Sequence, residues 1–122
     1  MRAPLRLISF DIDGTLEVGD PPGVVTLAVV RRALALGFVV GSCSDRTLAF
    51  QQQLWATHAI EVHFTALKQE LLGVKARFEV DHYLHIGDTP IDQMMAERAG
   101  FDFLHALDDD VRGYLRTHGL EG

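Results

Sequence analysis

Short apolar runs alternate along the chain with longer segments in which apolar residues recur at helical spacing. Runs of this length suit strands that are buried on both faces of a parallel sheet. They predict strands at residues 5–10, 38–43, 62–66, 83–86 and 101–104. The segments between and after these runs predict helices at residues 25–36, 46–58, 68–78, 90–99 and 111–118.

The apolar positions also predict which side of a helix is buried. In the second predicted helix, Phe50 and Leu54 lie one turn apart and indicate the buried side. In the fourth, Ile91, Met94 and Met95 form the apolar stripe.

The alternation of strands and helices is typical of the α/β class. We predict a doubly wound, three-layer α/β/α domain of Rossmann-like type, with a central five-stranded, mostly parallel sheet. A chain of 122 residues favours one domain over residues 1–122. In such sheets, ligands collect at the carboxyl ends of the strands, near the point where the strand order reverses.

The charge balance narrows the class of partner. The chain has 11 Lys and Arg against 17 Asp and Glu, a net charge of −6, so a nucleic-acid partner is not expected. The longest uncharged stretch, residues 47–60, contains three glutamines and is too short and too polar to span a bilayer, so no membrane partner is expected. The single cysteine, Cys43, and the lack of a signal-peptide pattern in the first ten residues predict a cytoplasmic location.

Two aspartates follow directly on the first predicted strand, in the segment Asp11-Ile12-Asp13-Gly14-Thr15. Carboxylates at the end of a buried strand are costly unless their charge is compensated, and a hard divalent cation with oxygen ligands would compensate it. Gly14 allows a sharp turn that brings backbone N–H groups near an anion. Taken alone, the segment is equally compatible with a solvated turn.

A second acidic cluster follows the fourth predicted strand. Asp88 lies in the loop and Asp92 lies about one turn into the next helix, where it could also serve as a first-turn acid that matches the helix dipole. If the first and fourth strands are neighbours, Asp11, Asp13, Asp88 and Asp92 converge. Four acids at one strand edge predict a magnesium site.

A hydroxyl and an ammonium group complete a site for phosphate. Ser42 and Ser44 come at the end of the second predicted strand, and Lys68 comes just after the third. Phosphate oxygens accept hydrogen bonds and carry negative charge, so these groups suit them. Either serine could instead cap the next helix, and Lys68 could be a surface lysine.

With these elements the chain resembles the phosphohydrolases of the haloacid dehalogenase superfamily. The superfamily's first motif, DxDGT, is met by residues 11–15, and its fourth, GDxxxD, by residues 87–92. The predicted strands extend the resemblance over nearly the whole chain.

The second and third motifs of the superfamily are a serine or threonine and a lysine. Ser44 meets the second best, because Ser44-Asp45-Arg46 resembles the common form of that loop, and Ser42 is the alternative. Lys68 meets the third best, with Lys75 as the alternative; the proline that often follows this lysine is absent.

The resemblance implies a Mg²⁺-dependent phosphomonoesterase with an aspartyl-phosphate intermediate. Asp11 would attack phosphorus, and Asp13 would protonate the leaving oxygen and then activate water. The implied phosphate-binding groups are Gly14, Thr15, Ser44 and Lys68. The implied metal-binding residues are Asp11, Asp13 through its backbone carbonyl, Asp88 and, as a ligand or by orienting the others, Asp92.

Larger members of the superfamily carry a cap domain, for which this chain has no room. About thirty residues separate Asp13 from Ser44, and residues 15–23 predict only a short flap. Such an open site suits a large substrate or a neighbouring subunit as a lid, so a homo-oligomer is possible. The natural phosphorylated substrate stays open.

Two further function classes fit part of the pattern. A phospho-accepting receiver domain has a similar length and an early acidic pair, but it places its accepting aspartate after the third strand, and no aspartate occurs between Arg46 and Val80. A catalytically silent binding module could keep the same fold. The six histidines show no metal-ligand spacing and predict structural roles, although His85 lies close to the proposed site.

Overall fold

Each predicted apolar run forms a strand of one parallel sheet. The computed structural model describes residues 4–121, with the exception of the side chain of Asp109. The strands are β1 (Arg6–Phe10), β2 (Val39–Ser44), β3 (Phe64–Leu67), β4 (His82–Gly87) and β5 (Asp102–His105). They pair in the order β3-β2-β1-β4-β5, and every pairing is parallel. The predicted doubly wound α/β class is therefore confirmed.

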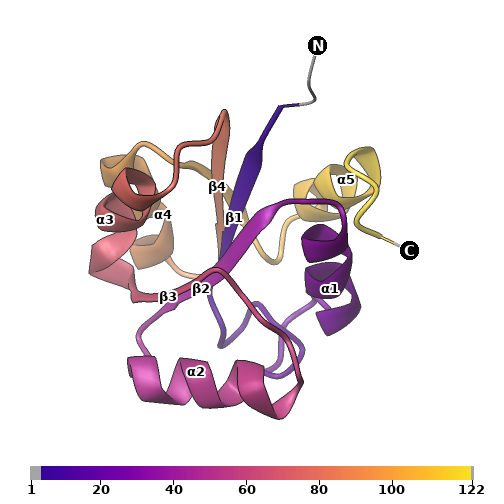
Figure 1. Ribbon diagram of the computed structural model, residues 1–122, viewed down its shortest axis with the longest axis vertical. Coiled ribbons are helices and arrows are strands. Elements are labelled where there is room, and N and C mark those ends of the chain that lie inside the picture. Colours follow the sequence, from indigo (N-terminus) through magenta and orange to yellow (C-terminus); the bar gives the residue numbers. More distant parts are fainter. Residues whose placement is uncertain (1–3, 122) are drawn as a thin grey trace.

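The helices cover both faces of this sheet. They are α1 (Leu27–Ala35), α2 (Leu48–Thr57), α3 (Leu71–Arg77), α4 (Pro90–Ala99) and α5 (Asp109–Thr117), with a 3₁₀ turn, η1 (Lys68–Glu70), before α3. In Figure 1, α3 and α4 lie to the left of the strands, and α1 and α5 lie to the right. The arrangement is the predicted three-layer, Rossmann-like one. Among the helices of residues 4–121, none has the length and apolar character that crossing a membrane requires.

Threonine caps set three of the helix starts. The side chains of Thr26, Thr47 and Thr89 accept hydrogen bonds from the backbone N–H groups three residues later. A side-chain oxygen at this position satisfies one of the N–H groups that a helix leaves without a partner. For α1 and α2 the cap places the first helical residue two positions later than the apolar pattern predicts.

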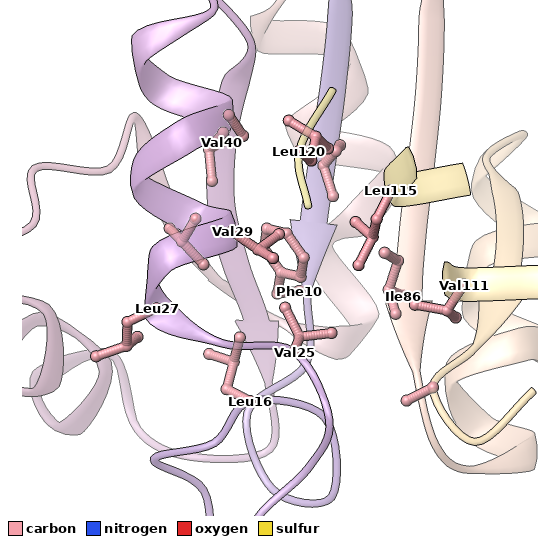
Figure 2. Close-up of a cluster of buried hydrophobic side chains, with 14 of the residues drawn as sticks. Phe10, Leu16, Val25, Leu27, Val29, Val40, Ile86, Val111, Leu115 and Leu120 are labelled. Carbon is pink, nitrogen blue, oxygen red and sulfur yellow. The ribbon is translucent and has the colours of Figure 1, made fainter. Parts of the chain in front are cut away.

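The side-chain alternation of β1 and β4 divides the core into two clusters. Ile8 and Phe10 of β1 and Ile86 of β4 point toward α1 and α5. Figure 2 shows Phe10 at the centre of that cluster, between Val29 of α1 and Ile86. Burying a large apolar side chain contributes about 1.5–3 kcal/mol, so Phe10 and Ile86 anchor the strand ends that carry Asp11 and Asp88.

The opposite face of the sheet packs against α3 and α4. Leu7 of β1, Cys43 of β2 and Ala96 of α4 belong to this second cluster. By the two-residue period of a strand, Ser9 and His85 lie on the same face, and their backbones are paired across β1 and β4. Both are fully buried, so the apolar layer contains a polar pair directly beside the carboxyl edge.

The predicted buried sides of α2 and α4 are only partly confirmed: Leu54 and Met95 pack against the core clusters, whereas Phe50, Ile91 and Met94 are exposed. In α2 the buried residues are Gln51 and Trp55, whereas Phe50 is 40% exposed. Gln51 is accommodated because its amide nitrogen donates to two backbone carbonyls and its oxygen accepts from Ser42. Hydrophobic periodicity does not register such partners, so a fully hydrogen-bonded glutamine takes a place that the pattern assigns to an apolar residue.

In α4 the correction bears directly on the site. Ile91 is 50% exposed and Met94 is 40% exposed, while Asp92, Ala96 and Ala99 are buried. The buried face of this helix therefore begins with a carboxylate.

The predicted flap joins β1 to α1 without a helix of its own. Leu16 and Val25 form an isolated bridge, and both are fully buried in the first cluster. Between them the chain folds back, with the N–H of Gly14 donating to the carbonyl of Pro21. The flap is thus held at both ends beside the start of the Asp11–Thr15 segment.

Candidate active site

Three carboxylates meet at the carboxyl edge of the sheet. Asp11 directly follows β1, Asp88 directly follows β4, and these strands are neighbours, as the acidic clusters require. Asp92, the third residue of α4, joins them. One oxygen of each carboxylate lies within 4.8 Å of the others. The predicted convergence of four acids is confirmed for Asp11, Asp88 and Asp92, but it is wrong for the side chain of Asp13, which is drawn to Arg46 instead.

Lys68 lies between these carboxylates. It is the first residue of η1, directly after β3, and only 4% of it is exposed. Its ammonium nitrogen lies 3.4 Å from Oδ2 of Asp11, 3.2 Å from Oδ2 of Asp92 and 3.4 Å from Oδ2 of Asp45. Burial by itself would lower the pKa of Lys68, but these three carboxylates raise it, so the ammonium stays charged.

Asp92 has a partner on each carboxylate oxygen. Oδ1 lies 2.8 Å from Nε2 of His85, and Oδ2 accepts a hydrogen bond from the hydroxyl of Thr89 at 2.8 Å. Thr89 also caps α4 by accepting from the N–H of Asp92, a reciprocal capping box. Burial alone would raise the pKa of Asp92, but His85, Thr89 and Lys68 together bring it below its usual range. Asp92 is therefore a fixed anion.

Two glycines make room for the carboxylates. A Cβ on Gly14, whose φ is +74°, would lie 1.8 Å from Oδ2 of Asp88. A Cβ on Gly87 would lie 2.3 Å from Cγ of Asp92. The glycines of the DxDGT and GDxxxD segments therefore allow close approach of a side chain to the backbone.

Asp13 lies apart from the three carboxylates and pairs with Arg46. Nε of Arg46 donates to Oδ2 of Asp13 at 2.8 Å, and Nη2 donates to Oδ1 at 3.2 Å. The N–H of Asp20, in the flap, also donates to Oδ1. The slight burial of Asp13 would raise its pKa, but Arg46 and the Asp20 N–H outweigh it and lower the pKa. A metal contact from Asp13 would have to come from its backbone carbonyl, which stays a prediction.

The alternatives for the serine and the lysine have different surroundings. The hydroxyl of Ser42 donates to Gln51 and accepts from Trp55, so it is used inside the first cluster. Ser44 ends β2 at the carboxyl edge, and its hydroxyl oxygen accepts from the N–H of Arg46. Lys75 donates to the carbonyl of Gly100, whereas Lys68 contacts the carboxylates.

Within the part of the chain that the structure describes, two buried oxygen atoms of the DxDGT and GDxxxD segments have no hydrogen-bond partner: Oγ1 of Thr15 and Oδ1 of Asp88. Buried polar groups are almost always paired, so each of these atoms points to a ligand. Carboxylate oxygens are the ligands that hard divalent cations prefer, and a free oxygen on Asp88 fits such an ion. A hydroxyl fits a phosphoryl oxygen.

The charge on Asp11 depends on what occupies the site. Its Oδ1 accepts from the N–H of Ile12 at 2.8 Å, and its Oδ2 faces Lys68. Burial, followed by the nearby carboxylate of Asp92, raises the pKa of Asp11 to about 8 despite these contacts. A divalent cation bound beside Asp11 would favour the ionised carboxylate at neutral pH.

Two residues of the site were not predicted to have a functional role. The sequence predicts a structural role for His85, yet its ring hydrogen-bonds to Asp92 and fixes that carboxylate. The feature that could have indicated this role is a polar residue inside an otherwise apolar strand, as Ser9 also is. The sequence assigns Arg46 no role beyond its place in the loop after β2. Its ion pair with Asp13 connects this loop to the loop after β1. Cys43 packs in the second cluster, and burial raises the pKa of its thiol.

A large surface hollow lies away from this edge. It has a volume of about 860 Å³ and is lined mainly by the end of α2 and the start of β3, including Trp55, Ile60, Phe64 and Arg77. None of the site residues line it. The volume of a hollow therefore does not identify the candidate active site, because the carboxylates and Lys68 lie elsewhere.

The chain matches no protein-family model, and no curated protein is detectably similar to it in sequence. The function of the site must therefore be inferred from the residues of this chain alone.

Proposed function

We propose that the chain is a Mg²⁺-dependent phosphomonoester hydrolase that acts through an aspartyl phosphate on Asp11. The observation that carries the proposal is the position of Lys68, buried between Asp11 and Asp92, two carboxylates that lie in one cluster with Asp88 and its unpaired oxygen. Phosphoryl transfer needs a nucleophilic carboxylate, a fixed positive side chain such as Lys68, and oxygen atoms that bind a metal cation.

Asp11 is the nucleophile in this proposal. Its Oδ1 is held by the Ile12 N–H, which leaves Oδ2, on the side of Lys68, to form the bond to phosphorus. As that bond forms, the bond from phosphorus to the substrate oxygen breaks, and the leaving oxygen takes a proton. Water then attacks phosphorus, which releases phosphate and restores the Asp11 carboxylate.

Asp11 and Asp88 are the residues that would hold the cation. Asp88 has a buried oxygen without a partner, whereas both oxygens of Asp92 already have one, so we expect Asp92 to hold Lys68 in place. When bound, Mg²⁺ would neutralise charge that otherwise keeps an anionic phosphoryl group away from Asp11.

The phosphoryl oxygens would be held by Lys68, Ser44 and Thr15. The Ser44 oxygen accepts from Arg46, so its own hydrogen remains available to donate. The Thr15 hydroxyl has no partner within the described residues. Asp13 is the only other carboxylate of the DxDGT segment, and as the acid and base it would serve the leaving oxygen and then water.

The strand order does not favour the receiver alternative. Receiver domains share the order 2-1-3-4-5 of flavodoxin-like sheets. Here the order is β3-β2-β1-β4-β5.

Hydrolysis of a generic aryl phosphate with and without Mg²⁺ tests the proposal. We expect metal-dependent activity that Asp11→Asn lowers by at least about 1000-fold, as is usual for loss of a nucleophile. Asp110→Asn, an exposed acid on α5, is the matched control and should keep full activity. Full activity in Asp11→Asn would refute the nucleophile. Stable phosphorylation without turnover would favour a switch, and no signal from any phosphodonor would favour a binding module.

A further inference from the structure

The loops at the carboxyl edge of the sheet contain two basic residues, Arg46 and Lys68. Lys68 is 4% exposed and is enclosed by carboxylates, whereas the side chain of Arg46 is 39% exposed. The acids in the same loops and in η1 are Asp11, Asp13, Glu17, Asp20, Asp45, Glu70, Asp88 and Asp108. Of these two basic residues, Arg46 is therefore the one whose side chain is open to solvent.

The Arg46 guanidinium is held on two sides. Its Nε and Nη2 atoms donate to the two oxygens of Asp13, and its Cζ lies 4.7 Å from the centre of the Phe50 ring. Phe50 is 40% exposed, so the guanidinium rests on an aromatic side chain at the rim of the site. This explains why Phe50, which the apolar pattern predicts to be buried, faces outward.

The Asp13–Arg46 pair conflicts with the role of Asp13 as a proton donor. Two N–H groups of the guanidinium occupy both carboxylate oxygens of Asp13, so neither oxygen is free to face a leaving oxygen. Asp13 can take up a proton and pass it to a leaving oxygen only after the guanidinium moves. A second anion on the substrate, close to the leaving oxygen, would draw Arg46 away from Asp13.

We propose that Arg46 determines substrate specificity, by binding a second anionic group on the phosphomonoester and thereby releasing Asp13. The preferred substrate class is then a phosphomonoester with a carboxylate or second phosphate a few atoms from the ester oxygen. Planar guanidinium groups bind both of these anions in bidentate geometry. The release of Asp13 is an inference that rests on the proposed function. The recognition of the second anion is inferred only from the distribution of charged side chains at this edge.

The kinetic test compares two substrates of equal length, 3-phosphoglycerate and glycerol 3-phosphate. The first has a carboxylate where the second has a hydroxymethyl group. The wild type should favour 3-phosphoglycerate in kcat/KM by about tenfold or more, which corresponds to about 1.4 kcal/mol. Arg46→Gln should abolish this preference, because it should lower kcat/KM for 3-phosphoglycerate about tenfold more than for glycerol 3-phosphate. Arg46→Lys, which keeps the charge without the planar fork, should be intermediate. Arg98→Gln, an exposed arginine on α4, should behave as the wild type.

A binding measurement separates this inference from the proposed function. Calorimetry with Mg²⁺ would compare phosphonoacetate with methylphosphonate, which lacks the carboxylate. Tighter binding of phosphonoacetate that disappears in Arg46→Gln supports Arg46 even if the wild type hydrolyses no phosphomonoester. Equal losses of activity on both substrates in Arg46→Gln would overturn the inference while leaving the phosphatase proposal intact, because Arg46 would then serve the reacting phosphoryl group. Equal binding of the two phosphonates, or binding of neither, would also overturn it.

Discussion

Nε2 of His85 lies 2.8 Å from Oδ1 of Asp92, and neither side chain is exposed to solvent. A carboxylate can only accept, so Nε2 carries the hydrogen. The other ring nitrogen, Nδ1, lies 2.9 Å from the hydroxyl of Ser9. A buried imidazole thus fixes the carboxylate that in turn holds Lys68 beside Asp11.

Replacing His85 should destabilise the fold according to what the new side chain can donate. His85→Leu leaves a buried carboxylate oxygen and a buried hydroxyl without partners, which should lower the free energy of unfolding by about 2–3 kcal/mol. His85→Gln can still donate to Asp92 and should lose less. Urea denaturation at pH 7 measures both, with Ser9→Ala, expected to lose about 1 kcal/mol, as the control. Equal losses for the leucine and glutamine variants would show that volume, rather than the hydrogen bond to Asp92, is what matters.

Without a divalent cation, the stability of the protein should fall as the pH rises from about 4 to about 8. Burial raises the pKa of Asp11 from 3.8 to about 8, so in this interval the folded protein holds a proton that the unfolded chain has released. The lowered pKa values of Asp13 and Asp92 act only below about 4, where their contribution is lost with falling pH. Urea denaturation in the presence of a chelator, at pH 5 to 8, should give a falling curve for the wild type and a flatter one for Asp11→Asn. Parallel curves would contradict the assignment.

Adding Mg²⁺ should reverse this loss of stability at pH 8. A ligand that binds only the folded state stabilises it by about 2.7 kcal/mol at a concentration of 100 times its Kd. Thermal unfolding with increasing Mg²⁺ should show a rising Tm in the wild type and little change in Asp88→Asn, whose carboxylate has the unpaired oxygen. Glu61→Gln, which removes an exposed acid before β3, is the control and should respond as the wild type does. An unchanged response in Asp88→Asn would place the cation elsewhere.

Two glycine-to-alanine changes should have opposite effects. Gly14→Ala puts a Cβ 1.8 Å from Asp88 on a residue with φ of +74°, so it should cost at least about 1–2 kcal/mol and weaken the Mg²⁺ response. Gly73→Ala, within α3, places its Cβ where nothing lies within 4 Å, and it should raise the free energy of unfolding by about 0.5–1 kcal/mol. Calorimetric melting of both variants checks the two signs. A stable Gly14→Ala with an unchanged Mg²⁺ response would contradict the idea that the cation site needs the close approach of Asp88 to Gly14.

The alternation of apolar runs and helical segments was sufficient to predict the class of fold. Every predicted strand and helix is present, with ends displaced by only one or a few residues, because burial between two helical layers requires continuous apolar strands. The meeting of Asp11 with Asp88 and Asp92 could also be predicted, since Asp11 and Asp88 follow strands whose carboxyl ends lie at one edge, but the pairing of Asp13 with Arg46 could not.

Only the tertiary structure decided which polar side chains lie inside. Gln51 and Asp92 replace apolar residues on the buried faces of α2 and α4 because each finds hydrogen-bond partners on other elements that the fold packs against its helix. The same kind of contact separates Ser44 from Ser42, since the latter is engaged by Trp55. A sequence pattern records how apolar each position is, and the free energy of a buried polar group depends on partners that only the folded chain brings within reach.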